Sequence, residues 1–306
     1  MKSTPFAVAG LAFFSLTAIA QLPPGINMDA VNTVLPEEGA PKAVPGKYAV
    51  TSGAATGNDA LRIYRPEKLD DFPRRDKLPV LVWGNGGCAI DNPRYGGFLE
   101  TIASHGFLVI TTAAGGAPAP APAQAGAPGA APRRSANADS LKAGIDWAEK
   151  ENARAGSPLA GKIDTTQVAV MGQSCGGRLS LELGADPRVK TIGVFNAGVK
   201  PADFKLLAPL HGPVLMINGH DRDFMMADSK ATYEAIDKLP AFYGARHGAG
   251  HTATAYHVGG GEYANVASNW VRWQFKKDKN AAKMFVGSKC DLCTNENWDA
   301  EGKRLK

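Results

Sequence analysis

Short apolar runs alternate with segments of helical periodicity along most of the chain. Residues 79–83 form a continuous apolar run that ends in Gly-Asn-Gly-Gly. A run of this length bounded by glycines is typical of a strand buried in a parallel sheet. Within residues 139–152, Leu141, Ile145 and Ala148 recur at helical spacing, which predicts a helix with one apolar face.

The same alternation predicts the class of fold. Further strands are expected at residues 48–51, 61–64, 107–111, 168–171, 191–195, 214–217 and 241–243, and further helices at 98–105, 176–183 and 263–271. The first two strands are expected to form an antiparallel edge. Strands that alternate with helices in this way predict an α/β fold with a mostly parallel central sheet and helices on both faces. One domain over residues 21–306 accounts for the whole pattern.

Two segments depart from the alternation. Residues 113–133 are almost entirely Ala, Gly and Pro, a composition that cannot bury enough apolar surface to hold one conformation. We expect a flexible insertion there, at the carboxyl ends of the strands, where open α/β sheets place ligands; a lid is the alternative. Residues 278–306 are polar and contain a Cys-x-x-Cys pair, and we expect them to form a C-terminal tail.

The N-terminus has the pattern of a secretory signal. Lys2 supplies a positive charge, residues 6–19 are apolar, and Ala18-Ile19-Ala20 offers a small-x-small cleavage site. The apolar run is short for a bilayer span. We therefore expect residues 1–20 to be a signal peptide, with a membrane anchor as the alternative. The mature chain is expected to be secreted or periplasmic and free of the membrane.

Composition narrows the classes of function. Of 306 residues, 44% are hydrophobic, which is enough for a sizeable core, and the net charge is only +5. No run of five or more basic residues occurs, so no nucleic-acid partner is expected. No fingerprint for a nucleotide, a flavin or a metal follows a predicted strand, so we expect no cofactor and no metal.

The four cysteines predict disulfide bonds. They are Cys88, Cys175, Cys290 and Cys293, and an even number in an exported chain is typical of a bridged protein. Cys290 and Cys293 have no second Cys-x-x-Cys and no paired histidines nearby. A local bridge is therefore favoured over a zinc site.

One motif carries specific chemistry. The strand predicted at residues 168–171 leads into Gly172-Gln173-Ser174-Cys175-Gly176, and a predicted helix follows. The two glycines permit a tight turn that lifts the serine hydroxyl above the sheet, at the N-terminus of a helix whose dipole favours developing negative charge. The alternative is a glycine-rich turn in which the serine has no role. The context predicts that Ser174 is a nucleophile.

With this strand–turn–helix motif, the chain resembles the α/β-hydrolase family over residues 79–275. The resemblance implies the chain order nucleophile, acid, histidine. A free serine hydroxyl is a poor nucleophile, so a histidine must take its proton and a carboxylate must orient the histidine.

That order can be matched to acids and histidines in this chain. The strand predicted at residues 214–217 is followed by Asp221 and Asp223. We favour Asp223, because the three apolar residues after it could pack beneath it and orient it. The histidine is expected to be His251, which follows the last predicted strand, and His247 is the alternative.

The resemblance also implies an oxyanion hole built from two backbone N–H groups. One should belong to the residue after the nucleophile, Cys175, and the other to the loop after the strand at residues 79–83, where we assign it to Cys88. Because both N–H groups must meet at one atom, Cys88 and Cys175 could lie close enough to form a disulfide. Two free buried thiols lining the acyl pocket are the alternative.

Within the family, Ala103-Ser104-His105-Gly106-Phe107 and the single-domain layout resemble secreted cutinases and polyester hydrolases. Three departures concern substrate. Cys88 stands where polyester hydrolases usually present an aromatic residue, Cys175 stands where methionine is common, and Asn196-Ala197-Gly198 replaces the aromatic that would clamp an aromatic ester. The resemblance implies a carboxylesterase acting on small or polymeric esters, without the stacking surfaces suited to aromatic polyesters.

Other functions share these residues. A secreted peptidase or acyltransferase would use the same triad with a different leaving group or acceptor. A hydrolase-like binding module would keep the fold without turnover. Labelling of Ser174 separates the module from the enzymes, and turnover of esters, amides and alcohol acceptors separates the enzymes.

Overall fold

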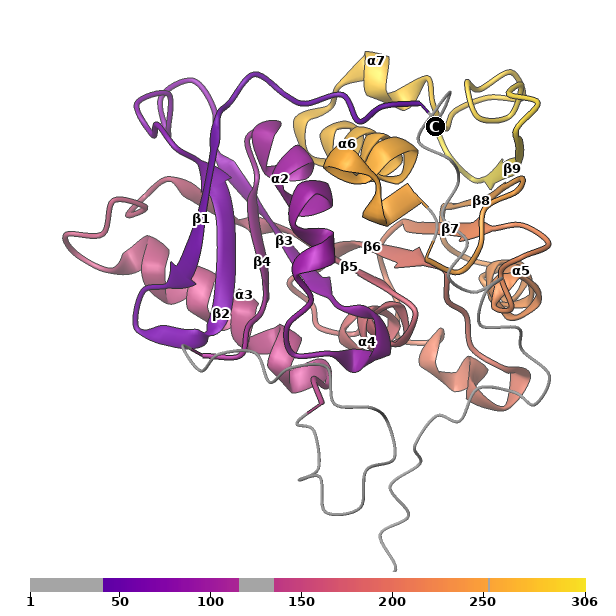
Figure 1. Ribbon diagram of the computed structural model, residues 1–306, viewed down its shortest axis with the longest axis horizontal. Coiled ribbons are helices and arrows are strands. Elements are labelled where there is room, and N and C mark those ends of the chain that lie inside the picture. Colours follow the sequence, from indigo (N-terminus) through magenta and orange to yellow (C-terminus); the bar gives the residue numbers. More distant parts are fainter. Residues whose placement is uncertain (1–40, 116–134, 253) are drawn as a thin grey trace, which may run out of the picture.

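The computed structural model describes residues 41–115, 135–252 and 254–306 (Figure 1). The expected signal peptide lies outside the described residues, as does most of the expected insertion at 113–133. None of the described helices is long and apolar enough to cross a membrane.

One mixed sheet of nine strands forms the centre of a single α/β domain, in the order β1-β2-β4-β3-β5-β6-β7-β8-β9. From β4 to β8 in that order the neighbours pair in parallel. The pairings of β1 with β2, β2 with β4 and β8 with β9 are antiparallel. The strands are β1 (Val50–Ala55), β2 (Asn58–Pro66), β3 (Leu78–Gly84), β4 (Leu108–Thr112), β5 (Ile163–Gln173), β6 (Val189–Phe195), β7 (Val214–Gly219), β8 (Ala241–Arg246) and β9 (Trp298–Lys303).

Helices cover both faces of the sheet, as the alternating pattern predicts (Figure 1). One face carries α3 (Ala138–Ala153), α4 (Cys175–Leu183) and α5 (Met226–Ala235), and the other carries α2 (Gly96–Ser104) and α6 (Gly261–Lys276). A short helix, α7 (Lys279–Ala282), follows α6.

The alternation of side chains along a strand explains why two apolar cores form. In β3, Val80 and Val82 belong to the core beneath α3 and α4, whereas Leu81 and Trp83 belong to the core beneath α2 and α6. Every residue of β3 is buried. A strand covered on both faces must be apolar on both, which is why it reads as a continuous apolar run.

The C-terminal segment differs from expectation. Residues 278–306 do not form a tail, because they include α7 and the strand β9, which extends the sheet by pairing with β8 from Trp298 to Lys303. The sequence of β9 is mostly polar and shows little strand periodicity, since an edge strand is held by backbone hydrogen bonds to its neighbour. The expected bridge between Cys290 and Cys293 is confirmed.

Candidate active site

The Gly172–Gly176 motif forms the turn between β5 and α4. Ser174 is the residue at the turn, with φ 53° and ψ −122°, a backbone conformation that non-glycine residues rarely adopt. Its N–H donates to the carbonyl of Phe195 on β6 at 2.8 Å. A Cβ on Gly172 would lie 2.4 Å from the carbonyl carbon of Gly176, and one on Gly176 would lie 2.0 Å from the oxygen of Gly84. Only glycine therefore fits on either side of the serine.

Three of the residues predicted to form the site lie in one chain of hydrogen bonds. Nε2 of His251 is 2.9 Å from Oγ of Ser174, and Nδ1 of His251 is 2.8 Å from Oδ1 of Asp223. With Nδ1 protonated, the imidazole donates to the carboxylate and Nε2 accepts from the serine hydroxyl. Asp223 lies in the loop after β7 and His251 in the loop after β8, so adjacent parallel strands deliver both groups to the same edge of the sheet as Ser174.

Asp221 and His247, the alternative acid and histidine, lie outside this chain of hydrogen bonds. The side chain of Asp221 is 68% exposed, and its Oδ1 is 3.6 Å from Nδ1 of His220. His247 pairs instead with Asp299, at 2.8 Å. The sheet places Asp223 and His251, rather than Asp221 and His247, next to the serine.

The carboxylate of Asp223 is buried and fully surrounded by donors. Oδ2 accepts from Nδ2 of Asn196 at 2.8 Å and from the N–H of Gly219 at 3.1 Å. Oδ1 accepts from the N–H of Met225 at 3.0 Å as well as from His251. A buried carboxylate is stable as an anion when its lone pairs are satisfied in this way. The apolar segment after Asp223 contributes a backbone N–H here, a contact that the sequence does not predict.

Asn196 is a site residue that sequence reasoning missed. It follows β6, is fully buried, and has a positive φ of 47°. In the sequence it stood out only as the residue that replaces an aromatic clamp. The available signal was its position: Asn196 is a polar residue directly after a buried strand, as are the residues of the loops predicted to carry the serine and the acid.

The loop that carries His251 is anchored from the motif itself. Nε2 of Gln173 donates to the carbonyl of His251 at 2.8 Å, and the hydroxyl of Tyr95 donates to Oε1 of Gln173 at 2.7 Å. Burial raises the pKa of Tyr95 well above its usual value, so this hydroxyl stays protonated and remains a donor. The ring of Phe224 packs against the His251 ring with centroids 4.1 Å apart. The position of the His251 imidazole is thus held by the hydrogen bond to its backbone carbonyl and by the Phe224 ring against one face.

A disulfide joins the two residues predicted to form the oxyanion hole. Cys88 and Cys175 are bridged, with Cα atoms 5.1 Å apart, which confirms the predicted bond over two free thiols. Cys175 is the first residue of α4, where backbone N–H groups have no acceptor within the helix. Cys88 has a positive φ of 49°. The two backbones therefore lie side by side next to Ser174.

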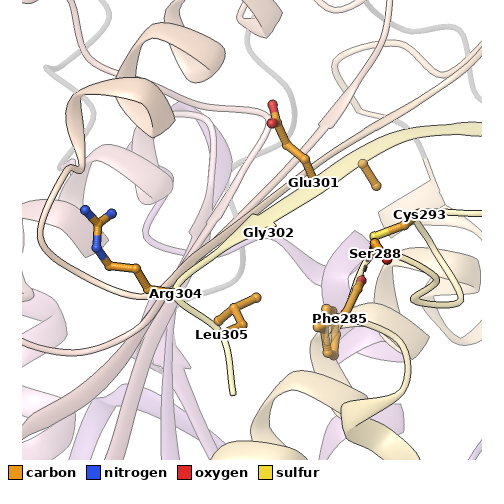
Figure 2. Close-up of a pocket in the computed structure, with 9 residues that line it drawn as sticks. Phe285, Ser288, Cys293, Glu301, Gly302, Arg304 and Leu305 are labelled. Carbon is orange, nitrogen blue, oxygen red and sulfur yellow. Dashed lines mark hydrogen bonds between the residues drawn. The ribbon is translucent and has the colours of Figure 1, made fainter.

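A surface pocket elsewhere on the molecule shares no residue with this site. It has a volume of about 440 Å³ and lies between the chain after α7 and β9 (Figure 2). Its lining includes Phe285, Leu305 and Cys293 of the local bridge, together with the charged Glu301 and Arg304. Glu301 pairs with Lys230.

One group of potential metal ligands occurs among the described residues, formed by His220, His247 and Asp299. Sequence patterns do not predict this group, because the three residues lie far apart along the chain. None of the three belongs to the Ser174–His251–Asp223 chain.

No model of a known protein family matches this chain, and no curated protein matches it either.

Proposed function

We propose that this protein is a serine hydrolase of the α/β-hydrolase fold that cleaves carboxylic ester bonds, with Ser174 as nucleophile, His251 as general base and acid, and Asp223 as the orienting carboxylate. The observation that carries the proposal is the unbroken chain of hydrogen bonds, 2.9 Å and 2.8 Å long, that begins at a serine held at positive φ between β5 and α4. Nucleophile, base and orienting group in this geometry support acyl transfer.

The proposed reaction has two halves. Oγ of Ser174 attacks the ester carbonyl carbon as its proton passes to Nε2 of His251. The tetrahedral intermediate then collapses, and the leaving alcohol takes that proton. In the second half, water gives a proton to Nε2 as its oxygen attacks the carbonyl carbon of the acyl-enzyme. The second tetrahedral intermediate then collapses, and the proton on Nε2 returns to Oγ of Ser174 as the acid leaves. Asp223 stabilises the imidazolium formed in each half.

The backbone N–H groups of Cys88 and Cys175 are assigned to the developing oxyanion. Their disulfide holds the two backbones in place before the reaction begins, and donors that need no rearrangement stabilise the transition state most effectively. The N-terminal end of α4 adds a favourable dipole.

The compartment and the substrate class form part of the same proposal. Two disulfides favour an oxidising environment, in agreement with a secreted or periplasmic mature chain. Because Asn196 is turned to the buried carboxylate of Asp223, it offers no surface on which an aromatic ester could stack. We propose small or aliphatic polymeric esters, as for the cutinase-like enzymes that the sequence resembles.

The test combines a covalent label with a substrate panel. A fluorophosphonate should label Ser174, identified by peptide mapping, and the protein should turn over chromogenic esters faster than the matching amides. Preferred turnover of the amides, or preferred transfer to an added alcohol, would instead favour the peptidase or the acyltransferase. Absence of both labelling and turnover from folded protein would leave a binding module.

Removing the Cys88–Cys175 bridge is expected to lower both stability and turnover. The bond joins residues 87 apart, and the entropy of closing such a loop corresponds to up to about 4.5 kcal/mol of stability. Loss of one oxyanion donor typically costs about 10²–10³ in rate, so we expect turnover in Cys88→Ala/Cys175→Ala to fall by at least about tenfold. Thermal unfolding and ester kinetics measure the two effects.

The second bridge provides a matched control. Cys290 and Cys293 are only three residues apart, so Cys290→Ala/Cys293→Ala should leave turnover close to that of the parent protein. Equal loss of turnover in both double variants would contradict a specific role of the Cys88–Cys175 bond at the oxyanion hole.

A further inference from the structure

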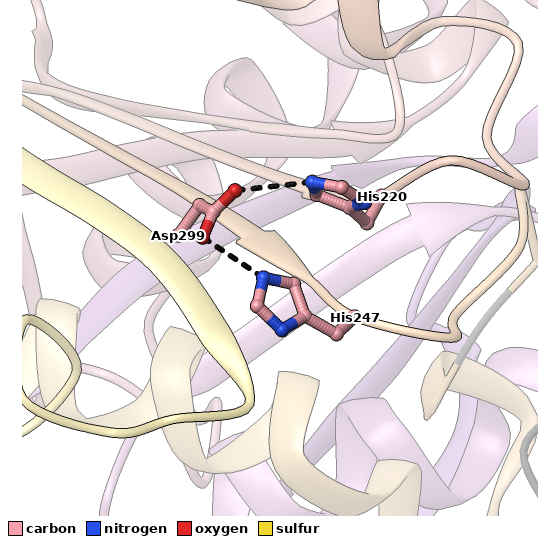
Figure 3. A group of neighbouring side chains, drawn as sticks. All are labelled: His220, His247 and Asp299. Carbon is pink, nitrogen blue, oxygen red and sulfur yellow. Dashed lines mark hydrogen bonds and ion pairs between the residues drawn. The ribbon is translucent and has the colours of Figure 1, made fainter.

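Two imidazoles share one carboxylate at the edge of the sheet where β7 and β8 end. Nε2 of His220 is 3.0 Å from Oδ2 of Asp299, and Nε2 of His247 is 2.8 Å from Oδ1 of the same residue. The two imidazole rings lie 4.8 Å apart between centroids. Figure 3 shows both rings directed at the carboxylate, and the potential ligand atoms of the three residues all lie within 4.8 Å of one another.

The backbone holds these three side chains in register. His220 directly follows β7, and its N–H donates to the carbonyl of Ala249 at 3.2 Å. His247 directly follows β8, and its N–H donates to the carbonyl of Asn297 at 2.9 Å. Asp299 lies within β9 and pairs with Ala245 of β8. The cluster is therefore positioned by the sheet and does not depend on a chance encounter of flexible side chains.

Two imidazole nitrogens and one carboxylate oxygen form a ligand set of recognisable chemistry. Imidazole suits divalent transition metals such as zinc, and three protein ligands leave a fourth position for water. Calcium and magnesium prefer oxygen ligands and are disfavoured here. Zinc binds nitrogen and carboxylate oxygen at about 2.0–2.2 Å, which places tetrahedral ligand atoms about 3.3–3.5 Å from one another. The two N···O pairs, at 3.0 Å and 2.8 Å, must therefore separate slightly, and any wider separation within the 4.8 Å limit must shorten. The side chains of His220, His247 and Asp299 are 29%, 40% and 61% exposed, so an ion can reach them from solvent.

We propose that His220, His247 and Asp299 bind one divalent transition-metal ion, with Zn²⁺ as the representative ion. With the ion bound, the Asp299 carboxylate no longer accepts hydrogen bonds from the two rings. Each Nε2 is then unprotonated and donates its lone pair to the metal. This site is separate from the proposed esterase chemistry and does not depend on it.

The position of the cluster gives the ion a structural role. The loop after His220 leads to Asp223, and the loop after His247 leads to His251. These loops run side by side, because Arg222 and Gly250 form a parallel bridge. An ion bound between His220, His247 and Asp299 would cross-link the start of both loops to β9. Binding is therefore expected to raise the thermal unfolding temperature.

The test uses untagged full-length mature protein freed of metal by chelation. Isothermal titration with Zn²⁺ should give one ion per chain, and Co²⁺ should produce visible absorption bands typical of tetrahedral nitrogen and oxygen coordination. Ca²⁺ should give neither binding heat at this site nor a rise in unfolding temperature. His247→Ala and Asp299→Asn should each weaken Zn²⁺ binding by at least about tenfold and abolish the Co²⁺ bands.

His211→Ala is the matched control. His211 is an exposed histidine that precedes β7, at the opposite end of that strand from His220, and its loss should leave Zn²⁺ binding unchanged. The proposal is overturned if the parent protein shows no saturable Zn²⁺ binding, or if His211→Ala weakens binding as much as His247→Ala. Circular dichroism of each variant shows that it is folded, and the Co²⁺ spectrum reports coordination independently of stability.

Discussion

Ser174→Ala is expected to lower ester turnover by about 10⁴–10⁶-fold while the protein remains folded. Without Oγ there is no acyl-enzyme, and the remaining rate comes from the oxyanion donors and from substrate binding alone. Alanine carries the same Cβ as serine, so the positive φ at this position costs the variant no additional strain. His251→Ala removes the proton acceptor that lies 2.9 Å from Oγ and should have a similar effect.

Ester kinetics on Ser174→Ala, His251→Ala and the double variant test this result. Residues that act as a unit are strongly non-additive, so the double variant should be little slower than either single variant. Ser180→Ala is a suitable control, because Ser180 lies on α4 and its hydroxyl donates only to the carbonyl of Gly176. Parent-like turnover in His251→Ala would remove this histidine from the proposed mechanism.

Asp223→Asn is expected to lower turnover by up to about 10⁴-fold through the tautomer of His251. Both oxygens of Asp223 accept from N–H donors, with Asn196 and Gly219 on Oδ2 and Met225 and His251 on Oδ1. An amide has only one oxygen. With that oxygen toward Asn196 and Gly219, its NH₂ group meets Nδ1 of His251. The imidazole must then carry its proton on Nε2, where it can no longer accept from Ser174.

The kinetics of Asp223→Asn and Asp221→Asn distinguish the two carboxylates. Asp221 is exposed and makes no contact with His251 among the described interactions, so its substitution should change turnover only slightly. The pH–rate profile of Asp223→Asn should also differ from that of the parent protein. In the variant, the rate is limited by the tautomer of His251 rather than by the fraction of His251 that is unprotonated. The opposite ranking of the two variants would move the acid role to Asp221.

Much of the architecture could be predicted because burial leaves a direct trace in the sequence. A central parallel strand such as β3 is apolar on both faces, and α3 shows its apolar residues at helical spacing. The edge strand β9 and the helix α5 were not predicted. β9 is polar and is held by backbone pairing to β8, and α5 has few buried residues among its ten.

The site divides in a similar way. Ser174 could be recognised because a tight strand-to-helix turn requires glycine on both sides, and that requirement is local. The roles of Asn196 and Gln173 could not be assigned from the sequence, because each acts through a contact with a distant residue, Asp223 or the carbonyl of His251. The His220–His247–Asp299 cluster arises in the same way from three separate strand ends.

Local sequence patterns predict the alternation of strands and helices, the turn that displays Ser174, and the types of residue available as base and acid. The fold selects the acid and the histidine that meet the serine, pairs Cys88 with Cys175, and adds β9 to the sheet. The physical reason is the range of the interactions. Periodicity and turn geometry are set by neighbours in the chain, whereas the hydrogen bonds and the disulfide at this site join residues that only the packing of parallel strands brings together.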